Sequence, residues 1–364
     1  MHDSGELWRY PSTWEQITVA DKAGVNGGRT HRGPQRDPPP VLKTGEPTGT
    51  QPLPIGRKDT PSEGVWQGRN ETALMRLTPL SHRAIVPLSM SLITLMTDFG
   101  LKDGNVGVMK GVILGIAPRA RIVDLSHFIS PQNVREAALI LRRSAPYFPS
   151  GTIHVVVVDP GVGTDRRPIA VQLGTQRFVG PDNGVITLLL EHTERQGWPI
   201  AVVHLDRPQF WLPDISHVFH GRDIFAPAAA HLANGAALLD LGTPVSDPVR
   251  LALPRPERTP AGWRGEIIHI DHFGNLASNI LGEHLPGWLD VAEKVTVRLC
   301  GVEIRGLVET FGERAPGELV ALFGSTGNLI VSVVNGSAAQ ALGAKVGDPC
   351  EVERLVESPG LDVG

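Results

Sequence analysis

From residue 92 to about residue 252, short apolar runs alternate with segments whose apolar residues recur at helical spacing. The apolar runs predict strands at residues 92–97, 121–126 and 152–159, and around Phe178 and Ile200. The other segments predict helices over residues 106–116, 133–145 and 223–233. The third strand contains VVVV, which is apolar toward both faces and typical of a mostly parallel sheet covered by helices. We therefore expect an α/β domain over residues 91–253.

A second pattern follows the segment PRPERTPAGW, residues 254–263, which we interpret as a linker. Beyond it, short apolar runs are separated by Gly and Asn turns, as in GEIIHIDHFG and ELVALFGSTGNLIVSVV. Strands joined by such turns predict a smaller all-β domain, a barrel or a sandwich, over residues 264–356.

Residues 1–90 show neither pattern. They are rich in Pro, Gly, Arg and Thr, and few apolar residues recur at a structural period. Such a segment cannot bury enough apolar surface to offset the entropy of ordering, so we expect a disordered extension. Because MSLITLMTDFG opens directly on a strand, a second hypothesis is that Met90 is the natural start and that the preceding segment is not native.

Composition narrows the classes of function. Apolar residues make up 41% and charged residues 20% of the chain, as in soluble globular proteins. A formal charge of −4 argues against nucleic acid as a partner. The two cysteines, Cys300 and Cys350, have neither metal-ligand spacing nor the number of a disulfide framework, which fits a reducing cytoplasm. The apolar run 88–96 is too short to span a membrane, and no signal peptide is recognisable.

Two predicted strands end in an acidic residue followed by a glycine-containing turn. Asp98 ends the first strand in LMTDFG, and Asp159 ends the third in VVVVDPGVG. Ligands of open α/β sheets bind outside the carboxyl ends of the strands, so both carboxylates are expected on one rim. For either residue alone, a turn or a helix cap is an alternative.

Two segments match motifs of other protein classes only superficially, and we reject both assignments. The DFG triplet lacks the Gly-rich loop, strand lysine and catalytic loop of a kinase. The sequence DPGVGT lacks the Gly-Lys-Ser/Thr ending of a phosphate-binding loop.

Other polar clusters leave both structural and functional interpretations open. In FHGRDIF, Asp223 is a plausible helix cap, whereas His220 precedes the cap in a turn. PDNG (181–184) signals a turn first and a ligand contact second. DHFGN (271–275) and GSTGN (324–328) fit hairpin turns, although a carboxylate and an amide there suit an amine and a base edge.

Taken together, TDFG, DPGVGTDRR, PDNG, HGRD, DHFGN and NGSAA occur in an order that resembles the adenosine-forming S-adenosyl-L-methionine hydrolase family, relatives of the fluorinases and chlorinases. The resemblance covers residues 92–355. It implies an α/β domain followed by a β-barrel, and no cofactor or metal. It also implies a homotrimer that binds S-adenosyl-L-methionine and adenosine between the first domain of one subunit and the second domain of its neighbour.

The resemblance assigns roles to particular residues. It implies a catalytic triad of Asp159, Arg166 and His220, and a ribose contact at Asp98. The remaining substrate-binding residues that it implies are Asn183, Asp271, Phe273, Asn275, Ser325, Asn335 and Gly336.

The triad favours hydrolysis over halogenation, because a carboxylate at Asp159 attracts water and repels a halide. The expected reaction is attack of water on C5′, giving adenosine and methionine, with the acceptor of the water proton left open between Asp159 and His220. Alternative hypotheses are a halogenase, a non-catalytic protein that binds S-adenosyl-L-methionine or adenosine, and a structural α/β protein.

Overall fold

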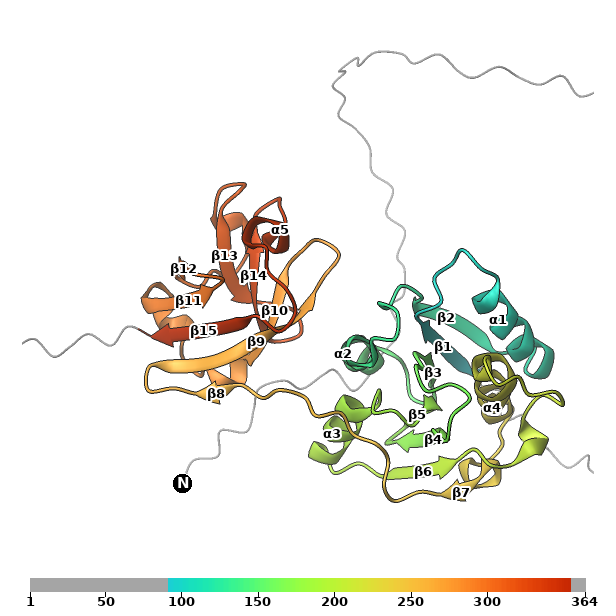
Figure 1. Ribbon diagram of the computed structural model, residues 1–364. Coiled ribbons are helices and arrows are strands. Elements are labelled where there is room, and N and C mark those ends of the chain that lie inside the picture. The colour runs from blue at the N-terminus through green and yellow to red at the C-terminus, as the bar shows by residue number, and fades with distance from the viewer. Residues whose placement is uncertain (1–90, 355–364) are drawn as a thin grey trace, which may run out of the picture. The chain divides into compact units, whose positions relative to one another are not determined.

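The computed structural model describes residues 91–354, which form an α/β domain and a β-barrel domain (Figure 1). Both halves of the predicted fold class are confirmed, with the sheet of the α/β domain mixed, partly parallel and partly antiparallel. The extension predicted over residues 1–90 lies outside the described residues.

The α/β domain contains a sheet of seven strands in the order β2-β1-β3-β5-β4-β6-β7. The strands are β1 (Leu92–Thr97), β2 (Arg121–Ser126), β3 (Ile153–Val157), β4 (Pro168–Leu173), β5 (Gln176–Pro181), β6 (Ile200–His204) and β7 (Thr243–Pro244). Strands β2, β1, β3 and β5 pair in parallel, whereas β4 is antiparallel to both β5 and β6. The parallel half therefore carries both acidic strand ends.

Helices cover both faces of this sheet (Figure 1). They are α1 (Asn105–Ile116), α2 (Val134–Ser144), α3 (Thr187–Arg195) and α4 (Ala226–Ala233). Helices α1 and α4 pack in one core with Val155 and Val157, and α2 and α3 pack in another with Val156 and Val158. Alternate residues of β3 thus enter different cores, which explains the uninterrupted apolar run.

The helix expected over residues 223–233 begins differently from a regular helix. A single π-helical turn, Gly221–Phe225, precedes α4. Such turns are frequent at functional sites.

The second domain is a nearly closed antiparallel barrel in the order β12-β11-β15-β9-β10-β14-β13, whose end strands β12 and β13 contact each other. Its elements are β8 (Glu257–Arg258), β9 (Gly262–Ile270), β10 (Leu276–Leu281), β11 (Val295–Leu299), β12 (Val302–Arg305), β13 (Leu319–Phe323), β14 (Asn328–Val333), the short helix α5 (Ala338–Leu342) and β15 (Pro349–Arg354). Strand β8 lies in the predicted linker and pairs with β9. The turns DHFGN and GSTGN connect β9 to β10 and β13 to β14.

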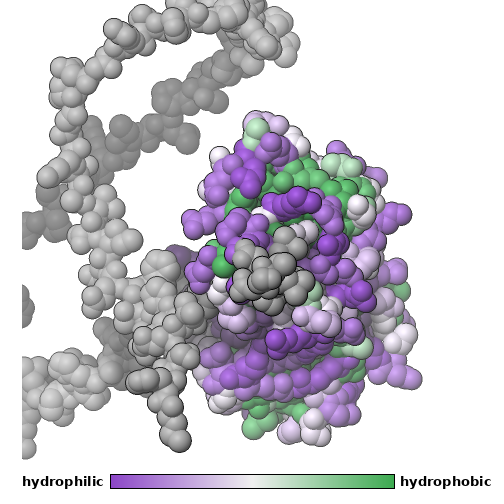
Figure 2. Space-filling view, turned by 90° about the vertical axis from the view of Figure 1, so that its left-hand side faces the viewer, coloured by the Kyte–Doolittle hydropathy of each residue, from purple (hydrophilic) through white to green (hydrophobic). Residues whose placement is uncertain are grey.

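The surface of the described residues carries both apolar and hydrophilic areas. Apolar areas lie among predominantly hydrophilic residues on the face shown in Figure 2. Among the described residues, large apolar side chains remain exposed at Val108 and Leu114 of α1, at Val123 of β2 and at Phe128. No helix among residues 91–354 is long and apolar enough to cross a membrane.

Candidate active site

The two acidic strand ends lie at the same edge of the sheet. Strands β1 and β3 are parallel neighbours with Thr97 opposite Val157, and Asp98 and Asp159 follow within two residues. The rim expected from the sequence is therefore present.

An ion pair closes the loop between β3 and β4. The Asp159 and Arg166 side chains are only 4% and 7% exposed. Arg166 donates from Nε to Asp159 Oδ1 over 3.0 Å and from Nη2 to Oδ2. A two-pronged pairing of this kind fixes the orientation of the carboxylate as well as its charge.

His220 joins this pair from a distant part of the chain. Its Nδ1 lies 3.1 Å from Nη2 of Arg166. A guanidinium only donates hydrogen bonds, so Nδ1 accepts and the neutral ring carries its hydrogen on Nε2. The structure thus brings together all three residues of the predicted triad, at the N-terminus of the π-helical turn.

Burial sets the electrostatics of the cluster. It raises the pKa of Asp159, against the opposing effect of Arg166 and His220. Burial and the Arg166 charge lower the pKa of His220. The imidazole is therefore held neutral, while the carboxylate is a stronger base than an exposed one.

Arg166 also retains an unused donor. Its Nη1 is buried and has no hydrogen-bond partner among residues 91–354. Its guanidinium lies over the Phe225 ring, 5.4 Å from the ring centre. Buried donors are normally satisfied, so this N–H is a candidate contact for a bound molecule.

Asp223 holds the turn that presents His220. Its fully buried carboxylate accepts from the backbone N–H of Ser216 at 2.8 Å and from Arg222 Nε at 2.5 Å. The interpretation of Asp223 as a helix cap is wrong, because the carboxylate ties the turn to the preceding loop.

Asp98 and Asn183, the other predicted substrate contacts of the α/β domain, already make hydrogen bonds within that domain. Asp98 accepts from the backbone N–H of Gln132 at 2.8 Å through Oδ2. Asn183 donates to the Val158 carbonyl at 2.9 Å and accepts from the Val185 N–H at 3.2 Å. Asn183 thus supports the residue just before Asp159.

The substrate contacts predicted in the barrel domain lie in turns between its strands. Asp271 accepts from the N–H groups of Phe273 and Asn275 and from the Asn275 side chain. Phe273 is 73% exposed. The remaining predicted contacts, Ser325, Asn335 and Gly336, are exposed. Within residues 91–354, no hydrogen bond or ion pair joins these barrel residues to the triad.

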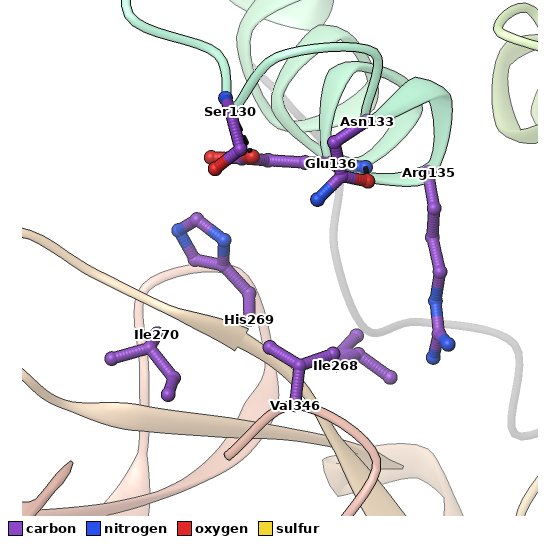
Figure 3. A pocket seen from close by; sticks show the side chains of 8 residues that line it. All are labelled: Ser130, Asn133, Arg135, Glu136, Ile268, His269, Ile270 and Val346. Atoms are coloured by element: carbon purple, nitrogen blue, oxygen red, sulfur yellow. Dashed lines mark hydrogen bonds between the residues drawn. The ribbon is translucent and has the colours of Figure 1, made fainter.

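The sequence alone predicts no functional role for the segment at the start of α2. Figure 3 shows it beside a pocket lined by Ser130, Asn133, Arg135, Glu136, Ile268, His269, Ile270 and Val346. Asn133 accepts from the Glu136 N–H, and Glu136 accepts from the Ser130 N–H. The spacing of Asn133 and Glu136 is that of a helix cap, a signal that the sequence contained. The pocket contains no triad residue, so it does not define the catalytic site.

Comparison with known proteins identifies the family. Residues 93–242 match the SAM hydroxide adenosyltransferase N-terminal domain, and residues 265–351 match the corresponding C-terminal domain. The chain belongs to the SAM hydroxide adenosyltransferase family.

Individual relatives agree with this result. The chain is 44% identical to the (R)-S-adenosyl-L-methionine hydrolase of Salinispora tropica, over 71% of this chain and 97% of the relative. It is 30% identical to a fluorinase of an Actinoplanes species, over 52% of this chain and 71% of that protein. A crystal structure of an uncharacterized conserved protein from Thermotoga maritima has a TM-score of 0.67 and 37% identity, covering 72% of this chain and all of the other.

Proposed function

We propose that this protein hydrolyses S-adenosyl-L-methionine at C5′, giving adenosine and L-methionine. The observation that carries the proposal is the cluster at the rim of the sheet in which the buried Asp159–Arg166 ion pair meets the partly buried His220. The 44% identity to an enzyme named for the (R) form of this substrate supports it and favours that sulfonium configuration.

The chemistry requires a positioned nucleophile rather than a better leaving group. The sulfonium already leaves readily, whereas water is weakly nucleophilic, with a pKa of about 15.7. Holding water in line with the carbon–sulfur bond supplies roughly 7–11 kcal/mol of the barrier reduction. The Asp159 carboxylate accepts a hydrogen bond from the water and orients it.

The proton passes to Asp159 rather than to His220. The Nδ1 atom of His220 accepts from Arg166, and its Nε2 carries the ring hydrogen, so the neutral ring offers no acceptor. As the C5′–O bond forms and the C5′–S bond breaks, methionine leaves with the sulfur electron pair. The Arg166 Nη1 donor stabilises the developing negative charge on the water oxygen.

The remaining roles are part of the same proposal. Asp98 binds the ribose hydroxyls and Asn183 borders the substrate. The barrel supplies the contacts to methionine and adenine through Asp271, Phe273, Asn275, Ser325, Asn335 and Gly336.

We also propose that the protein is a homotrimer whose barrel residues complete the site of a neighbouring subunit. A cytoplasmic location stays a prediction, with which the unpaired state of Cys300 and Cys350 agrees.

The test is incubation with the (R) and (S) forms of S-adenosyl-L-methionine in heavy-oxygen water, with and without chloride or fluoride. The expected products are methionine and adenosine with the label on the 5′ oxygen, formed faster from the (R) form and independently of halide. A 5′-halogenated nucleoside would instead identify a halogenase. Tight binding without any product would identify a non-catalytic binding protein.

A further inference from the structure

A row of polar side chains lies directly behind the turn that carries Asp98. Lys110 of α1 lies 2.6 Å from Asp124 of β2, and Asp124 Oδ1 lies 3.0 Å from His127 Nε2. His127 Nδ1 lies 2.9 Å from the Thr97 hydroxyl at the end of β1. The Thr97 side chain is fully buried and that of His127 is 3% exposed. The row therefore runs from the surface into the core and ends one residue before Asp98.

The neighbours of His127 indicate its tautomer. The Asp124 carboxylate has no hydrogen to donate, so the nitrogen beside it, Nε2, carries the hydrogen of the neutral ring, and Nδ1 accepts. The Thr97 hydroxyl donates to that Nδ1 and, through its own oxygen, accepts the Phe99 N–H at 3.2 Å. Phe99 is the residue immediately after Asp98.

His127 holds the turn at a second point. Its backbone carbonyl accepts the Gly100 N–H at 2.7 Å. Gly100 has a φ of +65°, so this turn adopts a conformation in which glycine is preferred. The two residues that follow Asp98 are thus both tied to His127, one through Thr97 and one directly.

We propose that His127 is a positioning residue that, through Thr97, holds Asp98 in the orientation that binds the ribose hydroxyls. The inference rests on the proposed role of Asp98. The Asp98 carboxylate is held from its other side by the backbone N–H of Gln132, whose φ is +64°. The hydrogen bonds of Ser130 and Asn133 with Glu136 fix that segment (Figure 3). Oδ2 accepts this N–H, and no hydrogen bond to Oδ1 occurs within residues 91–354, which leaves Oδ1 to accept from the ribose.

The same strand provides a matched control. Thr94 of β1 pairs with the buried His154 of β3, its hydroxyl 2.8 Å from Nδ1. Like Thr97 with His127, this pair is a buried threonine hydroxyl within hydrogen-bond distance of the Nδ1 atom of a buried histidine. No hydrogen bond in the described part of the chain links it to Asp98 or to the residues after it.

The experiment compares Thr97→Val with Thr94→Val, using the affinities for adenosine and 2′-deoxyadenosine measured by calorimetry. The wild type is expected to prefer adenosine by about tenfold or more, the effect of losing a hydrogen bond to a charged group. Thr97→Val should lower this preference at least about threefold, whereas Thr94→Val and Thr97→Ser should retain it. His127→Gln, which removes the Nδ1 acceptor, should behave as Thr97→Val does and serves if the valine variant does not fold.

Each of the other outcomes disproves either the positioning role of His127 or the proposed Asp98–ribose contact. An unchanged preference in both Thr97→Val and His127→Gln would disprove the positioning role and leave the hydrolase proposal intact. An equal loss in Thr94→Val would attribute the effect to general loosening of β1, and would also disprove it. If the wild type does not discriminate between the two nucleosides, the proposed Asp98–ribose contact fails, and this inference fails with it.

Discussion

At the scale of single residues, Arg166 organises the site. It is a donor to Asp159 and to His220 at once, so one guanidinium fixes a carboxylate orientation and an imidazole tautomer. Either effect would be lost with lysine, whose ammonium has no planar two-pronged geometry.

Asp159→Asn removes the proposed proton acceptor with little change of volume. We expect kcat to fall about 10²–10⁴-fold, the range for loss of a positioned acid or base, while adenosine still binds. Single-turnover assays and calorimetry measure the two effects. The control is Asp165→Asn, an exposed carboxylate in the same loop, which should retain activity. Normal turnover in Asp159→Asn would exclude Asp159 as the acceptor.

His154 makes folding stability depend on pH. Burial lowers its pKa from 6.5 to about 4. Below pH 6.5 the unfolded chain therefore takes up a proton that the folded chain does not, and stability falls until about pH 4. Between pH 7 and pH 5 this residue should cost about 2 kcal/mol of unfolding free energy.

The measurement compares thermal unfolding of the wild type and His154→Asn at pH 7 and at pH 5. Asparagine keeps an acceptor for the Thr94 hydroxyl but does not titrate. The variant should therefore lose less stability on acidification than the wild type. His272→Asn, at an exposed position, should behave as the wild type does. Equal losses in wild type and His154→Asn would refute the assignment.

At the scale of elements, two loops must touch for the triad to form. A Cβ added at Gly163, in the loop after β3, would lie 2.2 Å from the His217 carbonyl oxygen, and Gly163 has a φ of +77°. His217 belongs to the loop that leads to His220. The close approach of these loops therefore fixes the spacing between Arg166 and His220.

Gly163→Ala should separate the loops and lower kcat by at least about tenfold, because small displacements of catalytic groups have large effects on rate. Gly151→Ala is the matched control, since its φ is +83° but no atom lies within 4 Å of the added Cβ. It should cost about 1–2 kcal/mol of stability from the left-handed backbone alone and leave kcat unchanged. Full activity in Gly163→Ala would mean that the loops separate without moving His220.

The elements themselves were largely predictable, but their direction was not. Hydrophobic periodicity located β1, β2, β3 and helices α1 and α2. It did not reveal that β4 runs antiparallel to its neighbours, because a short apolar strand has the same pattern in either direction. Nor did it reveal the π-helical turn, since the helical pattern over residues 223–233 is compatible with either geometry and Asp223 bonds Ser216 in the preceding loop rather than a helix N–H.

At the scale of the whole molecule, the sequence indicated the triad only through the order of six motifs. His220 alone fitted a structural histidine, and its contact with Arg166 spans 54 residues. The polar row from Lys110 to Thr97 was not predicted, because its members come from α1, β2 and β1 and no local motif connects them.

The proposed shared site predicts complementation between inactive variants. Asp159→Asn and Asp271→Asn should each be inactive alone. Coexpressed in equal amounts, they should form trimers in which about a quarter of the sites combine an intact α/β domain with an intact barrel from the neighbour. Product formation per site measures the recovery.

The matched control is coexpression of Asp159→Asn with His220→Asn. Both changes affect the α/β domain, so every site of such a mixed trimer contains one of them and no activity should return. A failure of the first pair to recover would mean that each site is built within one subunit.

The ion pair between Asp159 and Arg166 closes within eight consecutive residues, and the sheet is continuous on both sides of them. Under the proposed roles, residues 159–166 largely determine which nucleophile the site prefers. This segment can be exchanged without altering the sheet on either side of it. Under the same roles, a change of nucleophile requires replacement of this short peptide and of its partner His220, while the sheet and the nucleoside contacts stay as they are. The loop between β3 and β4 is therefore the segment to redesign if the site is to bind a different small nucleophile.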